Sequence, residues 1–514
     1  MPNISAGSPK EQRHGPSLFS HFGVRSGWKK VDDTPEFASV IGAGGGHIPP
    51  CEKPPRYSRV RAHHTRNRDF NHLFLAQELV AGKQRNQEAQ CHAPLTAVGN
   101  KLLRGGDPPI WAAEFSLDGQ YLAVAGKSRF LTVFKVISTK EERKAQEEAE
   151  AHNGSIAERL SVPVFQSLPF REFHGHAGDV LALSWSKNNF LLSTAIDKTV
   201  RLWHPSRLDC LCLLAHDDVV TSVAFHPRDD RFFLAGSLDS QLRLWSIPDR
   251  KVVHSALAGE SITAVAFTPD GKFAICGLLN GICTFFDTVG LGVKYQIYAR
   301  SSRAKSTKSC KVTGIQTLGI PGDLGSQQVK VLITSNDSRV RVYDLNNKLP
   351  QAKFKGLKNQ SSQIHAHFSD DGKYIICGSE DRNAYIWPLD SQGDEIKDEL
   401  PYEFFDAHPE VVTNALMAPA ATRQLLSASG DPIYDLCNPP PVGLQNLEEC
   451  TAGLGVLHDS THSDAPLGAR RPESSAYIDR CKHSNGHIIV TTDRAGTIQV
   501  FRQDCAYNNQ QHGY

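Results

Sequence analysis

The sequence predicts an all-β protein, a seven-bladed β-propeller with a disordered N-terminal extension and inserted loops. Stretches of β-branched and aromatic residues recur along the chain. Each stretch ends in the same way: a turn residue, then a short run in which apolar and polar residues alternate, then an aromatic residue. Where successive copies lie closest, the repeating unit is about 40–45 residues long, the length of one four-stranded propeller blade. The copies end at seven aromatic residues: Phe134, Trp203, Trp245, Phe286, Tyr343, Trp387 and Phe501.

The N-terminal region, residues 1–67, is predicted to be a disordered and basic extension. Up to residue 55 it is rich in Gly, Ser, Pro and charged residues, so it offers little apolar surface to bury. The glycines at 42–46 precede His-Ile-Pro-Pro and no helix, which favours a linker over a phosphate-binding loop. The run RYSRVRAHHTRNR at 56–68 is strongly basic and could contact an acidic partner.

Residues 68–92 are predicted to form an amphipathic helix, because four apolar side chains come close to helical spacing on one face. They are Phe70, Leu73, Phe74 and Leu79. Such a helix could pack on the propeller, or it could contact a partner or an anionic membrane. The candidate partner-binding residues of this N-terminal region are Arg59, Arg61, Arg66, Arg68, Phe70 and Phe74.

The seven blades are predicted to span residues 105–505. Each would be a four-stranded sheet with both faces buried between neighbours, and the aromatic ends would fill the gaps between blades. Six residues before four of the aromatic ends lie Asp197, Asp239, Asp337 and Asp381. A Gly-His or Ala-His pair upstream of a blade supplies His176, His216 and His408.

In the second blade, four side chains can form the chain of hydrogen bonds that is typical of WD repeats. They are His176, Ser193, Asp197 and Trp203. A Ser-His-Asp hydrolase triad is the competing interpretation, but the same residue types recur with the repeat and no G-x-S-x-G turn is present. We therefore predict no catalytic residue and a set of structural staple residues: His176, Ser193, Asp197, Trp203, His216, Asp239, Trp245, Asp337, Tyr343, Asp381, Trp387 and His408.

Three blades depart from this pattern. Ser128, Asn280 and Ala495 stand at the aspartate position of the first, fourth and seventh blades. Because they lack the carboxylate acceptor, these blades are expected to be the least well stapled.

Three insertions are predicted at about 138–168, 295–311 and 432–484, and residues 506–514 form a tail. The charge pattern of the first indicates a solvated helix or disorder, and the third is a Pro/Gly/Ser-rich surface loop. The second is a solvated loop or a binding site for phosphate or an acidic partner. Its candidate partner-binding residues are Arg300, Arg303, Lys305 and Lys308.

Composition argues against several classes of function. Lys and Arg total 56 against 55 Asp and Glu, so the chain lacks the positive field of a non-specific nucleic-acid binder. No apolar run is as long as a membrane span and the first residues lack a signal-peptide core, which predicts a cytoplasmic protein. The 12 cysteines include no C-x-x-C pair, so no metal site, disulfide framework or cofactor is expected.

Whole stretches of the chain resemble the family of rabphilin-like, Rab-binding WD40 proteins that includes WD repeat-containing protein 44 and its fungal relatives. SWSKNNFLLS and FHPRDDRFFL carry the resemblance, as do FNHLFLAQEL before the first blade and AHPEVVTNALMAP before the last. The resemblance covers residues 68–505. It implies a non-enzymatic scaffold that binds a GTP-bound Rab GTPase in vesicle transport, with peripheral contact to anionic endosomal or Golgi membranes as a further option.

Residues 403–407, Glu-Phe-Phe-Asp-Ala, look like the core of the acidic two-phenylalanine motif with which relatives tether the endoplasmic reticulum. Alignment with CLCLLAH, which ends at His216, favours another interpretation. In it, YEFFDAH is the outer strand of the sixth blade, it leads into His408, and at least one of its phenylalanines is buried.

A substrate receptor of a ubiquitin ligase is the alternative function. Such propellers often carry Trp-Asp-x-Arg at a blade end. The nearest run here is Trp203-His204-Pro205-Ser206-Arg207, in which the aspartate is missing and the arginine is displaced.

Overall fold

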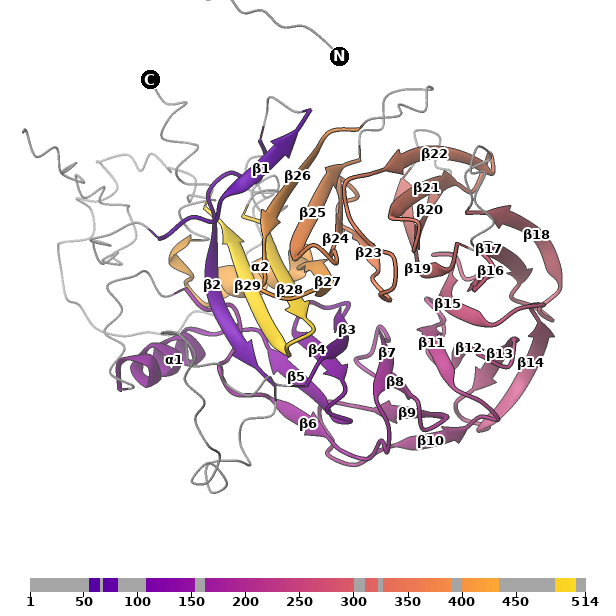
Figure 1. Cartoon of the computed structure of the whole chain (residues 1–514). Helices are drawn as coiled ribbons and strands as arrows, with labels where there is room; N and C mark the ends of the chain where they lie inside the picture. The colour runs from indigo at the N-terminus through magenta and orange to yellow at the C-terminus, as the bar shows by residue number, and fades with distance from the viewer. Residues whose placement is uncertain are drawn as a thin grey trace, which may run out of the picture. The chain divides into compact units, whose positions relative to one another are not determined.

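The computed structural model describes residues 55–64, 68–81, 108–152, 162–299, 310–321, 327–389, 400–433 and 486–504. In this part of the chain, 29 strands and two helices are present. The strands form seven antiparallel sheets, of which six have four strands and one has five (Figure 1). The prediction of an all-β, seven-bladed propeller is therefore confirmed.

The first four blades each use four consecutive strands. Blade 1 consists of β3 (Ile110–Phe115), β4 (Tyr121–Gly126), β5 (Leu131–Lys135) and β6 (Arg171–Phe173). Blade 2 consists of β7 (Val180–Trp185), β8 (Leu191–Ala195), β9 (Thr199–Trp203) and β10 (Cys212–Ala215). Blade 3 consists of β11 (Val220–Phe225), β12 (Phe232–Ser237), β13 (Gln241–Ser246) and β14 (Lys251–Leu257). Blade 4 consists of β15 (Ile262–Phe267), β16 (Phe273–Leu278), β17 (Ile282–Asp287) and β18 (Val293–Tyr298).

Two of the last three blades take a strand from the N-terminal part of the chain: a fifth strand in blade 6 and the fourth strand in blade 7. Blade 5 consists of β19 (Val312–Pro321), β20 (Gln327–Ser335), β21 (Arg339–Asp344) and β22 (Leu349–Phe354). Blade 6 consists of β23 (Ala366–Phe368), β24 (Tyr374–Cys377), β25 (Asn383–Pro388), β26 (Tyr402–Asp406) and β1 (Val60–His63). Blade 7 consists of β27 (Val412–Met417), β28 (Ile488–Asp493), β29 (Thr497–Gln503) and β2 (Leu73–Val80).

The blades follow one another around a closed ring. The first strand of each blade contacts the first strands of both neighbours, including β27 with β3, so these seven strands surround the centre (Figure 1). Each pair of adjacent blades shares one cluster of buried apolar side chains, and the cluster of blades 7 and 1 joins Leu416 and Ile498 to Leu122 and Phe134. The core of the protein therefore lies between the sheets, as the burial of both sheet faces requires.

The predicted amphipathic helix is wrong for residues 68–81, and residues 82–92 lie outside the described part of the chain. Residues 73–80 form strand β2, which pairs with β29 from Leu73↔Gln503 to Val80↔Thr497. The strand has a register shift between Leu75 and Gln77. Because of this shift, the inward-facing apolar side chains do not follow strict alternation, and their spacing in the sequence resembles that of a helix. The propeller therefore includes residues upstream of position 105.

The predicted disorder of residues 1–67 is also wrong for residues 55–64, while the rest of that range lies outside the described residues. Strand β1 pairs with the outer strand of blade 6, with Val60 opposite Phe405 and His63 opposite Tyr402. Val60 joins the apolar cluster between blades 6 and 7. The buried valine, the pairing with β26 and the hydrogen bond from the Tyr57 hydroxyl to Asp504 at 2.7 Å hold this basic segment on the propeller.

Two helices lie outside the repeat. Helix α1 (Lys140–His152) occupies part of the first predicted insertion, and Arg143 and Gln146 on it are buried, so the helix is solvated on one side only. Helix α2 (Ala420–Ala428) follows β27. Residues 300–309 and 434–485, which make up most of the other two insertions, lie outside the described residues.

Candidate interaction surface

The predicted staple residues of blade 2 lie together. His176 Nδ1 lies 2.9 Å from Asp197 Oδ2, and its Nε2 lies 2.8 Å from Ser193 Oγ. The indole N–H of Trp203 donates to the same Ser193 Oγ at 2.8 Å. A Cβ at Gly175, where φ is 153°, would lie 2.6 Å from Arg201 Nη1, so glycine fits best before the histidine.

Burial and hydrogen bonding determine the charge states of His176 and Asp197 in this hydrogen-bonded set of side chains. Burial lowers the pKa of His176, so the imidazole is neutral near pH 7. Burial alone would raise the pKa of Asp197, but hydrogen bonds from the Ala177 N–H, Thr199 and His176 hold it below its ordinary value. Ser193 is fully buried and therefore cannot meet a substrate. The geometry fits a structural staple and does not fit a hydrolase triad.

Replacing Asp197 with alanine is expected to lower the free energy of unfolding by about 1–3 kcal/mol, because its buried donors would lose their acceptor. Asp197→Asn keeps an acceptor oxygen and should cost less. Urea unfolding followed by circular dichroism measures both changes. An Asp197→Ala variant as stable as the parent would show that the carboxylate contributes nothing to blade 2.

In blades 3, 5 and 6, the turn aspartate has a different partner from the one expected. It pairs with the side chain two residues before the aromatic end: Asp239 with Arg243 at 2.6 Å, Asp337 with Arg341, and Asp381 with the Tyr385 hydroxyl at 2.7 Å. His216 still accepts from the Trp245 indole N–H at 2.9 Å, but it does not reach Asp239. The Trp387 indole N–H donates to the Lys355 carbonyl, and Tyr343 is buried at the end of blade 5.

Blade 7 keeps part of a staple although Ala495 stands at the aspartate position: His408 Nδ1 and Asp493 Oδ2 approach each other without forming a hydrogen bond. His408 Nε2 lies 2.8 Å from Thr491 Oγ1, and its Nδ1 lies 3.2 Å from Asp493 Oδ2. His408 and Asp493 are both buried. The aspartate lies two residues before Ala495, at the end of β28, where blade 2 has Ala195. The turn has the same length in both blades, so a search at a fixed offset from Phe501 misses this aspartate.

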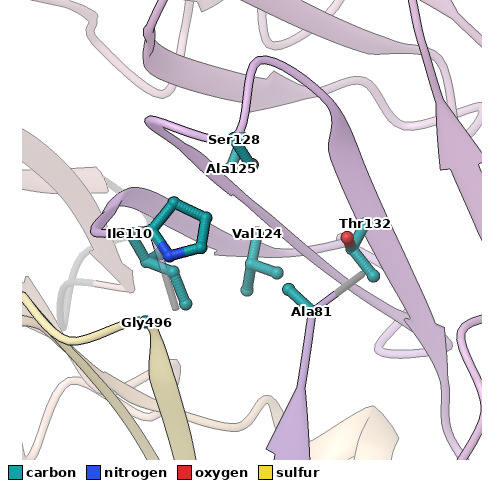
Figure 2. A pocket seen from close by; sticks show the side chains of 8 residues that line it. Ala81, Ile110, Val124, Ala125, Ser128, Thr132 and Gly496 are labelled. Carbon is teal, nitrogen blue, oxygen red and sulfur yellow. The ribbon is translucent and has the colours of Figure 1, made fainter. Parts of the chain in front are cut away.

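Blade 1 has a small hollow where blade 2 has its staple (Figure 2). Val124 takes the position of Ser193, and Ser128 takes that of Asp197, so neither acceptor of the blade 2 chain is present. The buried hydroxyl of Thr132 at this hollow has no hydrogen-bond partner in the structure. The space would hold about one water molecule, so it is a packing gap rather than a ligand site.

The candidate partner-binding residues divide into three groups. Phe70 and Phe74 are buried in the propeller, so their assignment to a partner surface is wrong: Phe70 packs between blades 6 and 7, and Phe74 packs against Val162 and Ile433. Three arginines are exposed: Arg59, Arg61 and Arg68. The remaining five lie outside the described residues: Arg66, Arg300, Arg303, Lys305 and Lys308.

The exposed arginines belong to a basic edge on blade 6. We define the basic edge as the exposed residues Arg56, Arg59, Arg61, His63, His64 and Arg68. It is held in place by β26: the Arg61 guanidinium carbon lies 5.9 Å from the centre of the Phe404 ring, and His63 stacks on Tyr402 with ring centres 4.7 Å apart. Sheet pairing therefore holds Arg61 and His63 in a fixed arrangement at the outer edge of the blade.

The Glu-Phe-Phe-Asp-Ala sequence forms most of β26 and pairs on both sides, with β25 and with β1. The Glu403 carboxylate accepts hydrogen bonds from the backbone N–H groups of Asp69 at 2.7 Å and Phe70 at 3.2 Å. Burial raises the pKa of Glu403, and these bonds partly offset the rise. The strand interpretation is confirmed, and in this conformation the segment is not available as a docking peptide.

A buried cluster of ion pairs was not predicted from the sequence. The carboxylate of Asp431 accepts two bonds from the Arg502 guanidinium, at 2.7 and 2.8 Å, and one from Arg143 Nη2 at 2.8 Å. It ties helix α1 and the segment after α2 to strand β29. Its members come from parts of the chain far apart in sequence, and two of them lie outside the repeat, so no local pattern indicates the cluster.

Within the described ranges, no group of three or more His, Cys, Asp and Glu side chains converges as the ligands of a metal ion would. No helix there combines the length and apolar character needed to cross a membrane.

Comparison with known proteins links these blades to a family. The WD domain, G-beta repeat, matches residues 167–204, 208–246 and 352–388. The chain is 49% identical over 263 residues to WD repeat-containing protein 44 of Xenopus laevis, which covers 50% of this chain and 28% of that relative. It is 35% identical over 415 residues to an uncharacterized WD repeat-containing protein of Schizosaccharomyces pombe, covering 79% of this chain and 65% of the relative. It is 30% identical over 575 residues to 2-deoxy-glucose resistant protein 2 of Saccharomyces cerevisiae, covering 88% and 66%. This chain thus matches between about a quarter and two thirds of the length of these relatives.

Proposed function

Because this chain is a WD40 repeat protein, homologous to WD repeat-containing protein 44 and to fungal WD repeat proteins, we propose that it is a protein-interaction scaffold that binds a GTP-bound Rab GTPase in vesicle transport. The homology carries the proposal. The WD40 propeller is in general a non-enzymatic scaffold, in which a rigid ring of sheets presents many loops to partners.

The basic edge is the surface that we assign to the GTPase. Arg61 stands on β1, which is paired along its length with β26, and Arg59 directly precedes that strand, so binding at these two arginines would not have to order the backbone first. Arginine is also the cation best suited to bind carboxylates through two hydrogen bonds. An acidic protein surface is the complement of this edge, and an anionic membrane surface is a further contact that the same charges would favour.

The proposal is tested with a panel of purified Rab GTPases, each loaded with GDP or with a non-hydrolysable GTP analogue, and the full chain immobilised for interferometry. We expect binding only in the GTP-analogue state. The double variant Arg59→Glu/Arg61→Glu should weaken it by at least about tenfold, or 1.4 kcal/mol. Arg207→Glu/Lys251→Glu, on exposed positions of blades 2 and 3, is the matched control and should bind like the parent.

Absence of nucleotide-dependent binding across the panel would remove the GTPase from the proposal and leave a scaffold for other proteins. Equal loss in both double variants would instead show a non-specific effect of charge. The ubiquitin-ligase alternative gains no support from blade 2, since Trp203 is fully buried and His204 follows it.

A further inference from the structure

Six blades share one turn geometry on the face that carries the loops before the first strands. There, the residue that begins the turn between the second and third strands donates its backbone N–H to the carbonyl of the residue just before the first strand, at 2.9–3.1 Å. The donors are Lys127, Ile196, Leu238, Leu279, Asn336 and Arg494. These six residues are structurally equivalent and lie on one face of the ring.

Three consecutive blades place a large aliphatic side chain at this position. Ile196 in blade 2 is 48% exposed, and Leu238 in blade 3 and Leu279 in blade 4 are each 41% exposed. The Ser261 hydroxyl, in the loop before blade 4, donates to the Leu238 carbonyl at 3.0 Å, so the loops of neighbouring blades touch here. Single exposed apolar residues are ordinary, but here three occupy one repeated position on consecutive blades, and we call this set the apolar strip.

The loops around the apolar strip are acidic. On this face of blades 2 to 4, the loops 174–179, 196–198, 216–219, 238–240, 258–261 and 279–281 contain six carboxylates and one lysine. The Asp217 side chain is 92% exposed and that of Asp218 is 40% exposed. Two cations pair with them, since Arg243 lies 3.3 Å from Asp217 and Lys198 lies 3.8 Å from Asp218. A third cation, Arg201, has its guanidinium beside Gly175 in the first of these loops. The carboxylates still outnumber the cations, so the surface around the apolar strip has a net negative charge.

We propose that the apolar strip binds a peptide segment of a partner protein in which aliphatic or aromatic side chains stand next to Lys or Arg. The apolar side chains would cover Ile196, Leu238 and Leu279, and the cations would pair with the exposed carboxylates beside them. Apolar contact supplies affinity, and charge supplies selectivity and a fast encounter. The same carboxylates repel an anionic membrane and nucleic acid, so a basic peptide is the occupant that fits.

This partner differs from the one assigned to the basic edge. The strip belongs to blades 2 to 4 and carries the opposite charge, whereas the basic edge belongs to blade 6. A scaffold with both surfaces could hold an acidic and a basic partner together.

The test uses an array of short synthetic peptides in three classes: leucine with arginine, leucine with glutamate, and serine with arginine. The full chain should prefer the leucine-arginine class, and fluorescence anisotropy then gives the affinity of its tightest member. Ile196→Ser/Leu238→Ser/Leu279→Ser should weaken binding by at least about tenfold. Lys127→Ser/Asn336→Ser/Arg494→Ser changes the equivalent positions of other blades and should bind like the parent.

Charge is tested separately with Asp217→Asn/Asp218→Asn, which should weaken binding most at low salt. All substituted side chains are at least partly exposed, and circular dichroism melts confirm that each variant folds. The proposal is overturned by a preference for the glutamate class or for no class, by an aliphatic triple variant that binds like the parent, or by equal losses in both triple variants. Binding of GTPases should be unaffected throughout, so this proposal and the GTPase proposal fail independently.

Discussion

Replacing Leu73 and Leu79 together with alanine is expected to lower the free energy of unfolding by about 4–10 kcal/mol, since each buried Leu→Ala change costs about 2–5 kcal/mol. Both side chains belong to β2, and both are buried. Leu73 packs in the cluster between blades 6 and 7, and Leu79 in the cluster between blades 7 and 1. Because the two clusters are separate, the two losses should add.

Leu75→Ala is the matched control, because this leucine lies on the same strand and is 43% exposed. It should change stability by no more than about 0.5 kcal/mol. Thermal and urea unfolding of the three proteins measure the difference. If the double variant unfolds at the same urea concentration as Leu75→Ala, β2 is not part of the closed ring.

Asp431→Ala is expected to lower the free energy of unfolding by about 3–5 kcal/mol, because it would leave the guanidinium groups of Arg143 and Arg502 buried without their carboxylate. All three side chains are buried. Asp431→Asn keeps the shape but not the charge, so it should recover only a small part of the loss. Urea unfolding is again the measurement.

Asp209→Ala provides the control for this second variant, since Asp209 is exposed in the loop before β10. It should be close to the parent in stability. A loss in Asp431→Ala no greater than that in Asp209→Ala would mean that the ion pairs contribute nothing net to the fold.

The number of blades could be predicted from sequence because each blade repeats its own signals. An aromatic residue such as Trp203 or Trp387 ends the third strand of a blade, and a turn precedes that strand. Strand β2 could not be identified in this way. Its spacing fits one face of a helix as well as a strand with a register shift, and its partner β29 lies hundreds of residues away. Local periodicity carries no information about such a pairing.

The staple residues were predictable only where the aspartate stands at the repeated turn position. His176 and Asp197 follow the repeat and meet in blade 2, but Asp493 stands at the end of β28, two residues before the repeated position. In blades 3 and 5, the turn aspartate pairs with the arginine two residues before the aromatic end. Blade 2 has Arg201 at the same position, but its Asp197 bonds with His176, so this arginine was not a dependable sign of the partner. Asp431 had no such sign, because its partners are brought to it only by the complete fold.

The position of strand β2 near the N-terminus also determines when the ring can close during translation. The contact between Asp69 and Gln503 joins residues 434 positions apart, so β2 must wait for its partner until translation has passed β29. Until then, the side chains of Leu73, Phe74 and Leu79 are exposed to chaperones and proteases, and the other blades form an open arc. A premature stop codon before β29 would therefore remove the same seam as a deletion that removes β2. Both products would be propellers with an unclosed ring, so chaperones and proteases in the cell should recognise them in the same way.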